Sequence, residues 1–209
     1  MAGAIVPTGA VVAMSERRRL LAGIVLAFSN FMVVLDMTIA NVSIPAIAGN
    51  IGVSLNQGTW VITSYAVAEA ITVPLTGWLA KRFGGARVFI ACYLSFALVS
   101  LLCGLSGSLG ALIGGRIALG LVGGPIMPLS QMLLLRIFPP KQATASTVLW
   151  AMTTLIGPIV GPTLGGVICE NATWHWIFLI NVPVALIGGA VVVFMLRGQP
   201  DPSQPASID

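Results

Sequence analysis

The sequence carries very little charge. Only 8% of its 209 residues are Asp, Glu, Lys or Arg, whereas 57% are hydrophobic and the mean hydropathy is +1.00. An ordinary soluble domain is about 25% charged. So few charges exclude a soluble enzyme, and they exclude a nucleic-acid-binding surface even though the net charge is +4. The chain is therefore predicted to be a membrane protein, whose basic residues report its orientation.

Residues that bind metals or carry redox chemistry are also scarce. The three cysteines, Cys92, Cys103 and Cys169, have neither CxxC nor metal-ligand spacing, and His175 is the only histidine. This pattern predicts neither a disulfide framework nor a metal site. No nucleophile, metal cluster or phosphate-binding loop stands in a suitable context. We therefore expect no metal, no cofactor and no enzymatic activity.

What the sequence does have is long apolar segments. Each is long enough for the roughly 20 residues that a helix needs to cross the hydrocarbon core of a bilayer. Six such segments lie at about residues 20–44, 59–80, 88–106, 109–134, 144–168 and 176–196. The predicted fold class is an all-α membrane protein.

Three parts of the chain follow from these segments. Residues 1–19 are predicted to form a cytoplasmic N-terminal segment, and residues 20–197 a bundle of six transmembrane helices. Residues 198–209 are polar and rich in proline. This composition is typical of a tail or of the start of a linker rather than of a fold.

The basic residues are distributed unevenly between the loops. Nine of the ten lie at alternate ends of the apolar segments, and the other three loops have none. The nine are Arg17, Arg18, Arg19, Lys81, Arg82, Arg87, Arg136, Lys141 and Arg197. Because cytoplasmic loops carry the excess of Lys and Arg, this asymmetry predicts that both termini are cytoplasmic.

Three ionisable residues, Asp36, Glu69 and Arg116, lie inside the predicted spans. A charge at the centre of a bilayer costs at least about 2.5–3.5 kcal/mol, so each of them needs a partner or a use. Arg116 keeps its proton in practice and needs a permanent partner, which either acid can provide. Protonation of that acid would free Arg116, so the three residues are candidates for proton coupling. The alternative is a static structural ion pair.

Five uncharged polar residues accompany the two acids on the first two spans. They are Asn30, Asn41, Tyr65, Thr72 and Thr76. The asparagines flank Asp36, and the other three share a helix face with Glu69 because they lie at spacings of i−4, i+3 and i+7. We expect this polar stripe to face a wet substrate cavity. For Glu69, binding of a proton or a cationic substrate and a satisfied structural role both stay open.

The stretch GPIVGPTLGG, residues 157–166, places two prolines and four glycines inside the fifth span. The motif residues are Gly157, Pro158, Gly161, Pro162, Gly165 and Gly166. Three of the glycines recur at every fourth position, and such GxxxG steps let two helix backbones approach closely. The prolines bend the helix, which membrane helices tolerate. The stretch therefore predicts a close helix contact.

Four motifs together resemble one family. The GxxxGPxxGG pattern of the fifth span is similar to the signature of proton-coupled antiporters in the major facilitator superfamily. LDMTIANVSIPAI, residues 35–47, resembles the first-span motif of the fourteen-span drug:proton antiporters, the EmrB/QacA type. GWLAKRFGGARVF, residues 77–89, resembles the superfamily's loop between spans two and three. RIALGLVGGPIMP, residues 116–128, resembles a fourth-span motif built on an intramembrane arginine.

With the sixth-span stretch WHWIFLINVP, the resemblance extends from Leu35 to Pro183. The loop motif contributes Gly77, Lys81, Arg82, Gly84 and Arg87. The superfamily often has an aspartate where this chain has Lys81, so the usual cytoplasmic gate pairing through that carboxylate does not carry over.

The resemblance implies the N-terminal six-helix bundle of a multidrug efflux transporter of the bacterial inner membrane. Amphipathic, often cationic drugs would leave in exchange for protons, with Arg116 in proton coupling. The implied partners are a second transporter half needed for activity, a periplasmic membrane-fusion adaptor and an outer-membrane channel. The glycine face of residues 157–165 is implied to meet a helix of the second bundle.

Two alternatives stay open at this point. The chain is a non-transporting membrane subunit or scaffold, or an inactive truncated product, if it has no second bundle to work with. A solute:proton symporter is a weaker alternative, because the fifth-span motif is typical of antiporters.

Overall fold

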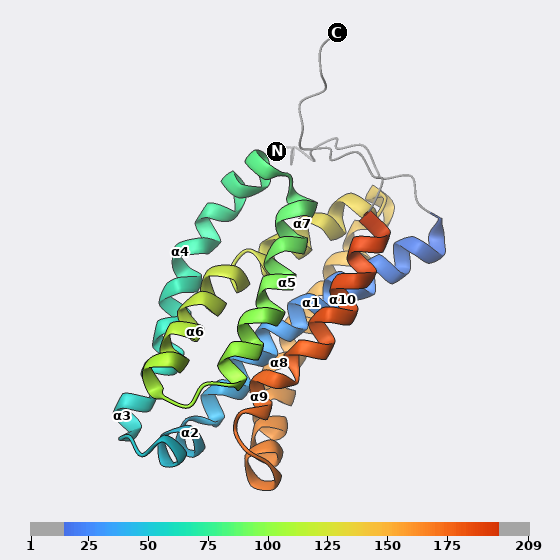
Figure 1. Cartoon of the computed structure of the whole chain (residues 1–209). Coiled ribbons are helices and arrows are strands. Elements are labelled where there is room, and N and C mark those ends of the chain that lie inside the picture. Colours follow the sequence, from blue (N-terminus) through green and yellow to red (C-terminus); the bar gives the residue numbers. More distant parts are fainter. Residues whose placement is uncertain (1–14, 197–209) are drawn as a thin grey trace, which may run out of the picture.

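The computed structural model describes residues 15–196, without the side chains of the last two. Arg197, the predicted tail at 198–209 and most of the predicted segment at 1–19 lie outside the described residues. Within the described range the chain is helical and has no β-strand (Figure 1). The helices are α1 (Glu16–Val42), α2 (Ile44–Ile51), α3 (Leu55–Gly58), α4 (Trp60–Phe83), α5 (Gly85–Gly104), α6 (Leu109–Gly123), α7 (Ile126–Ile137), α8 (Ala143–Asn171), α9 (Trp176–Leu179) and α10 (Asn181–Leu196), with a short 3-10 helix at Pro140–Gln142.

Helices occupy all six segments predicted as spans, and these correspond to α1, α4, α5, α6 with α7, α8, and α9 with α10. Among the described residues, five of the six are long and apolar enough to cross a membrane. The exception is α4, which has 24 residues. Its length suffices, but Glu69 and its hydroxyl-bearing residues lower its hydropathy. A polar helix of this kind is stable in a membrane where neighbouring helices cover it.

Two of the predicted spans are interrupted rather than continuous. The fourth breaks between Gly123 and Ile126, and the sixth breaks at Ile180. Both breaks have a proline at or just after them, Pro125 and Pro183. Proline has no N–H to donate to the carbonyl four residues earlier, and its ring crowds that carbonyl. The apolar pattern alone does not reveal these interruptions.

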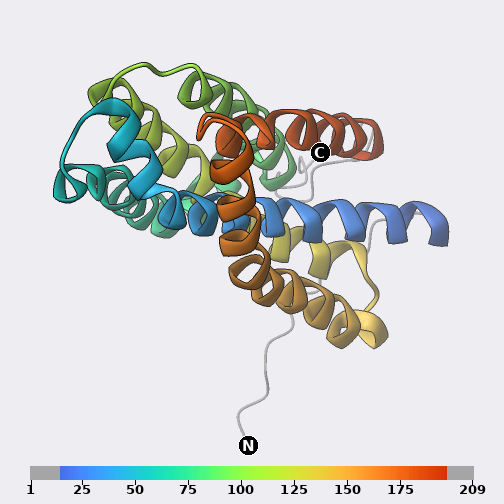
Figure 2. The same cartoon turned by 90° about the horizontal axis from the view of Figure 1, so that it is seen from below.

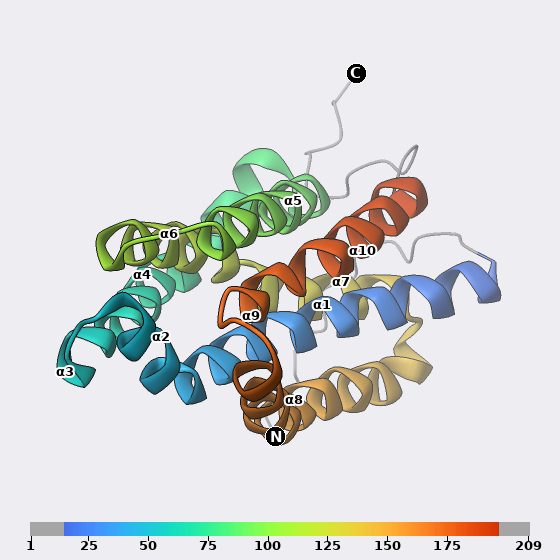
Figure 3. The same ribbon diagram turned by 60° about the horizontal axis from the view of Figure 1, so that its bottom comes forward.

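Helix α1 lies at the centre of the bundle. It packs most extensively on α8 and also contacts α7 and α10, while α4 packs on α6 and α5 packs on α10 and α6. Figures 2 and 3 show α1 crossing the middle of the molecule, with α8 on one side and α10 on the other. A residue of α1 can therefore contact helices on two sides, and these helices lie far from α1 in the sequence.

The helix ends that carry the basic residues gather at one end of the bundle. Figure 1 shows the turn from α4 to α5, the end of α7 and the end of α10 at the top, whereas α2, α3 and α9 lie at the bottom. The charge asymmetry of the sequence is thus an asymmetry between the two ends of the folded bundle.

Candidate functional site

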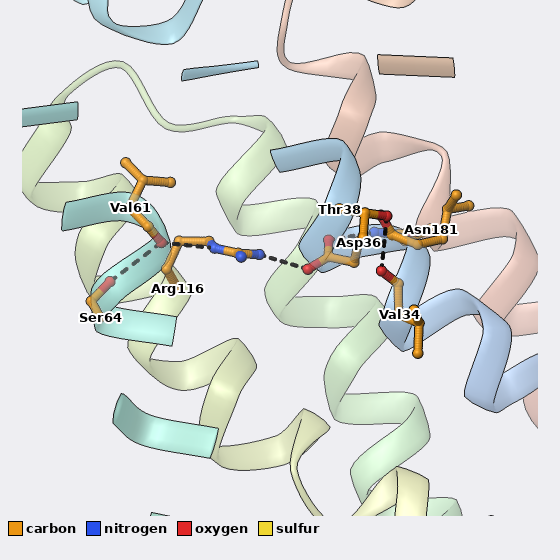
Figure 4. A network of polar contacts seen from close by, with 8 residues as sticks. Val34, Asp36, Thr38, Val61, Ser64, Arg116 and Asn181 are labelled. Atoms are coloured by element: carbon orange, nitrogen blue, oxygen red, sulfur yellow. Dashed lines mark hydrogen bonds and ion pairs between the residues drawn. The ribbon is translucent and has the colours of Figure 1, made fainter. Parts of the chain in front are cut away.

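A buried ion pair joins α1 to α6. Nη1 of Arg116 donates a hydrogen bond to Oδ2 of Asp36 at 2.6 Å, and the two side chains are 0% and 1% exposed. It is the one ion pair among residues 15–194. Of the two acids that the sequence offers to Arg116, Asp36 is the one that it contacts in this structure (Figure 4).

Arg116 is also held by α4. Its Nε donates to the carbonyl oxygen of Val61 at 3.1 Å, and its guanidinium carbon lies 4.2 Å from the centre of the Tyr65 ring. The face of an aromatic ring attracts a cation, and more strongly where water is excluded. Nη2 of Arg116 makes no hydrogen bond to any residue that the structure describes. The guanidinium thus connects three elements, α6, α1 and α4, while the two N–H groups of Nη2 have no partner among the described residues.

Asp36 has a second partner, which sequence reasoning missed. Nδ2 of Asn181 donates to Oδ1 of Asp36 at 2.7 Å, so each carboxylate oxygen has its own donor. Figure 4 shows Arg116 and Asn181 approaching Asp36 from opposite sides. Asn181 is the first residue of α10. An asparagine inside an apolar segment, two residues before Pro183, is the signal that could have identified it.

Two glycines of α6 explain how Arg116 comes to lie beside Tyr65. A Cβ atom added to Gly120 would overlap the carbonyl oxygen of Tyr65, and one added to Gly124 would overlap the hydroxyl of Thr72. Small residues at these positions let α4 and α6 approach closely. The close contact places Arg116, one turn before Gly120, against the buried face of α4.

Glu69 has different surroundings. It is half-buried, and its carboxylate makes no hydrogen bond or ion pair with the described residues. Its backbone nitrogen lies 3.0 Å from where a Cβ of Gly120 would be, so it sits one turn along the α4–α6 contact from Arg116 and Tyr65. The structure therefore separates the two intramembrane acids into a paired one and an unpaired one.

The five residues expected at a substrate cavity have different surroundings in this structure. Asn30 is buried and donates to the hydroxyls of Thr153 and Thr154 on α8, at 3.1 and 2.8 Å. Asn41 is exposed. A groove of about 350 Å³ between α4 and α6 is apolar, and none of the five lines it.

The other three polar residues, on α4, are already engaged in the α4–α6 contact. Tyr65, Thr72 and Thr76 are buried. The Thr72 hydroxyl donates to carbonyl oxygens of its own helix and of Gly120, and the Thr76 hydroxyl donates to the carbonyl oxygen of Thr72. Only the Thr72 hydroxyl bonds across to α6, since that of Thr76 bonds its own helix and that of Tyr65 has no hydrogen-bond partner among the described residues.

The glycine face of α8 packs on α1, within the same bundle. A Cβ atom on Gly157 would lie 3.0 Å from Cβ of Val34, and one on Gly161 would overlap the side chain of Thr38. A Cβ on Gly165 would lie 3.3 Å from a carbonyl oxygen of α1. A contact of this face with the second bundle stays a prediction, whereas its close contact with α1 is seen directly. The physical reason for the close contact is that α1 offers a complementary surface with a hydroxyl that bonds α8, since Thr38 donates to the carbonyl of Gly157 at 3.3 Å.

The rest of the motif faces elsewhere. Pro158 and Pro162 are exposed, and an added Cβ on the half-buried Gly166 would meet open space. Asp36 lies between Val34 and Thr38, which α8 contacts. The glycine motif thus supports the turn of α1 that carries the paired acid.

The predicted loop motif forms the turn between α4 and α5. Gly84 has φ 90°, a backbone conformation that only glycine adopts readily. Lys81, Arg82 and Arg87 are exposed, and none makes an ion pair with a described residue. Gly77 is exposed too, with open space at its Cβ position. These cations are available at the surface.

Helices long and apolar enough to cross a bilayer, with an ion pair buried between two of them, define a multi-pass membrane protein. The chain belongs to the Major Facilitator Superfamily, whose sequence profile matches residues 26–209. The family resemblance of the four motifs is thereby confirmed.

The chain is similar over most of its length to two curated relatives. The chain is 50% identical over 186 residues to the multidrug export protein EmrB of Escherichia coli K12, covering 89% of this chain and 36% of that protein. It is 50% identical over 162 residues to the fatty acid resistance protein FarB of Neisseria gonorrhoeae, covering 78% of this chain and 32% of that protein. The chain thus spans about a third of the length of these curated relatives, in their N-terminal portion.

A solved structure shares the fold. It is that of a bacterial homolog of the human lysosomal transporter Spinster, in an inward-facing and unoccupied conformation, with a TM-score of 0.71 at 18% identity. The match covers 90% of this chain and 45% of the other. At this identity the likeness is one of fold alone.

Proposed function

We propose that the chain is the N-terminal half of a multidrug efflux transporter, which exports amphipathic, often cationic compounds in exchange for protons. The observation that carries the proposal is the buried ion pair of Asp36 and Arg116. The names of the relatives, multidrug export protein and fatty acid resistance protein, support the export of apolar and amphipathic compounds. Because the chain spans about a third of their length, the second half of the transporter is part of the proposal.

Proton binding acts through this pair. While Asp36 is ionised, it neutralises Arg116 and holds α1 to α6. A proton on Asp36 removes the counterion, and a buried cation that has lost its partner is destabilised by about 3–5 kcal/mol. Arg116 keeps its contacts with Val61 and Tyr65. It now favours any arrangement of the helices in which it contacts water or another carboxylate. Protonation is thereby converted into a relative movement of α1 and the α4–α6 pair, which alternating access requires.

Glu69 is the second acid in the proposal. It is half-buried and unpaired among the described residues, and it lies one helix turn from the level of Arg116. A carboxylate in such a position raises the local concentration of cations. We propose that Glu69 attracts cationic substrates. It is also the nearest alternative counterion for Arg116 on α4.

The proposed setting is the bacterial inner membrane, with both chain termini in the cytoplasm. The gathering of the basic helix ends at one end of the bundle supports this orientation. A periplasmic membrane-fusion adaptor and an outer-membrane channel complete the proposed assembly. Single cysteines at Ser54 and Asn171 should react with an impermeant reagent from outside the cell, whereas one at the exposed Arg82 should not. Protection of the first two would reverse the orientation.

Transport by purified protein tests the proposal. Lipid vesicles receive this chain alone, or this chain together with the C-terminal half of the transporter, and efflux of a fluorescent cationic dye is driven by an imposed proton gradient. We expect gradient-driven efflux only with both halves, with protons moving opposite to the dye. Co-movement of protons and dye would indicate symport. No efflux in either preparation would favour a scaffold or an inactive product.

A further inference from the structure

The third member of the buried network is Asn181. Its amide donates a hydrogen bond to the carboxylate oxygen of Asp36 that Arg116 does not contact. We propose that Asn181 is a positioning residue that holds Asp36 in both its ionised and its protonated form, so that protonation releases Arg116 and not α10. Its importance for transport rests on the proposed function. The pairing itself can be tested without transport.

The geometry favours a fixed partner. Nδ2 of Asn181 lies 2.7 Å from Oδ1 of Asp36, and Asn181 is 2% exposed. It begins α10 directly after the break at Ile180, and α10 packs along α1. A side chain at the start of a packed helix, with water excluded, has little freedom to leave its partner. Arg116, in contrast, reaches Asp36 at the end of a long side chain.

The chemistry distinguishes the two partners. A guanidinium has five donors and no acceptor, so Arg116 can bind a carboxylate oxygen but cannot accept a hydrogen bond from a carboxylic acid. A primary amide has both two donors and an acceptor oxygen. Asn181 can therefore serve Asp36 in either protonation state.

The proposed step is a simple exchange of hydrogen bonds. A proton adds to Oδ1 of Asp36, and the amide of Asn181 turns by half a rotation about its terminal bond. The bond from Nδ2–H of Asn181 to Oδ1 is lost, and the new O–H of Asp36 donates to the amide oxygen of Asn181. No covalent bond other than that of the added proton forms or breaks. The link between α1 and α10 is kept, while the attraction between α1 and α6 is lost with the charge.

Infrared difference spectroscopy of the chain in lipid nanodiscs follows this pair directly. The carbonyl band of protonated Asp36 is identified by its loss in Asp36→Asn, and its growth is titrated against pH. Asn181→Leu keeps the size but removes the amide. Because Asn181→Leu removes the hydrogen bond to Oδ1, we expect the growth of the Asp36 band with pH to differ from that of the wild type. The carbonyl band should also shift to higher frequency, because the acid has lost its acceptor.

A second variant keeps the test decisive if Asn181→Leu folds poorly. Asn181→Asp has the same shape but places a second carboxyl group against Asp36. Two carboxyl groups at this distance cannot both ionise, so they share a proton and titrate as a coupled pair. We expect about one additional bound proton per chain near neutral pH, measured by proton uptake. Asn181→Gln, which keeps an amide, should lie between wild type and Asn181→Leu.

A matched control removes a different buried bond between helices. Trp150 on α8 donates to the hydroxyl of Ser130 on α7 at 3.0 Å. Ser130→Ala deletes that bond and should leave both the titration and the carbonyl band of Asp36 unchanged. A general loss of packing would instead affect Ser130→Ala and Asn181→Leu alike.

The outcomes separate this inference from the proposed function. An unchanged Asp36 titration in Asn181→Leu together with no added proton in Asn181→Asp would overturn the role of Asn181. If those changes occur but Asp36→Asn retains proton-driven efflux, the pairing stands and the proposed coupling site is wrong.

Discussion

The two acids inside the bundle are held in opposite ways. Asp36 on α1 is buried, and each of its carboxylate oxygens accepts a hydrogen bond from a different helix. Glu69 on α4 is half-buried and makes no hydrogen bond or ion pair with the residues that the structure describes. Both lie in predicted spans and both are one substitution away from a neutral amide. The surroundings of the two carboxylates, and not their chemistry, distinguish the roles proposed for them.

This difference indicates how one bundle can bind both a proton and a cation. A carboxylate with two donors and a counterion changes the contacts between helices when it gains a proton. A carboxylate with no partner changes little in the packing, but its field acts on mobile charges nearby. We therefore expect substitutions around Asp36 to affect coupling and those around Glu69 to affect substrate preference. The following variants, in the complete transporter, test this contrast.

Asp36→Asn should have the largest effect. The amide keeps the size of the side chain but cannot bind a proton and leaves Arg116 without a counterion, a penalty of about 3–5 kcal/mol that corresponds to at least about a 100-fold loss of gradient-driven efflux. Dye efflux from vesicles under a proton gradient measures it. Downhill dye equilibration without a gradient serves as the control. Wild-type proton flux in this variant would move the coupling site out of Asp36.

Gly161→Leu should have the next largest effect, because it forces α8 away from the turn of α1 that carries Asp36. Overpacking of a tight contact costs about 1–3 kcal/mol, so we expect efflux to fall by about 10- to 100-fold while membrane insertion is retained. Gly114→Leu on α6 is the matched control, since a Cβ there meets open space. Equal efflux in the two leucine variants would show that the close contact is not needed.

Arg116→Lys should have an intermediate effect. Lysine keeps the positive charge but loses the planar fork that contacts Asp36 and Val61 together. Loss of about one charge-assisted hydrogen bond predicts roughly a tenfold lower efflux. Arg116→Met, which removes the charge, gives the reference for complete loss of the pair. Arg116→Lys as inactive as Arg116→Met would mean that geometry matters more than charge.

Glu69→Gln should have the smallest effect and the most selective one. An incompletely buried, unpaired charge contributes at most about 1 kcal/mol, so efflux of a cationic dye should fall by about two- to fivefold. Efflux of a neutral compound should be unchanged, and the ratio of the two in the same vesicles is the measurement. A loss that is equal for both compounds, or as large as that of Asp36→Asn, would contradict the division of roles.

Hydropathy was sufficient to predict the spans and the fold class. The expected segments at 20–44 and 144–168 correspond to α1 and α8 within a few residues, since a bilayer imposes a length on apolar helices. The interruption near Pro125 was not predicted, because it changes the backbone without changing the apolar pattern. The sequence therefore predicted the positions of the helices better than the interruptions within them.

The site was predictable in part. The three intramembrane charges are visible in the sequence, but the choice of Asp36 over Glu69 depends on which helix faces meet, and a single sequence does not contain that. Asn181 was missed because an asparagine in a span carries no formal charge. The contact of the glycine face with α1 was not predicted, because GxxxG predicts a close approach without specifying the other helix.

The buried pair of Asp36 and Arg116 is electrically neutral, and this affects which forces would drive the proposed transport. With Asp36 ionised, its charge and that of Arg116 cancel, so the site moves no net charge when the bundle rocks in the membrane. With a proton on Asp36, the same site carries one positive charge. The membrane voltage acts on that charge with about 2.3 kcal/mol per 100 mV if it crosses the whole field. In the proposed cycle the protonated pair would therefore be acted on by voltage, whereas the ionised pair would not.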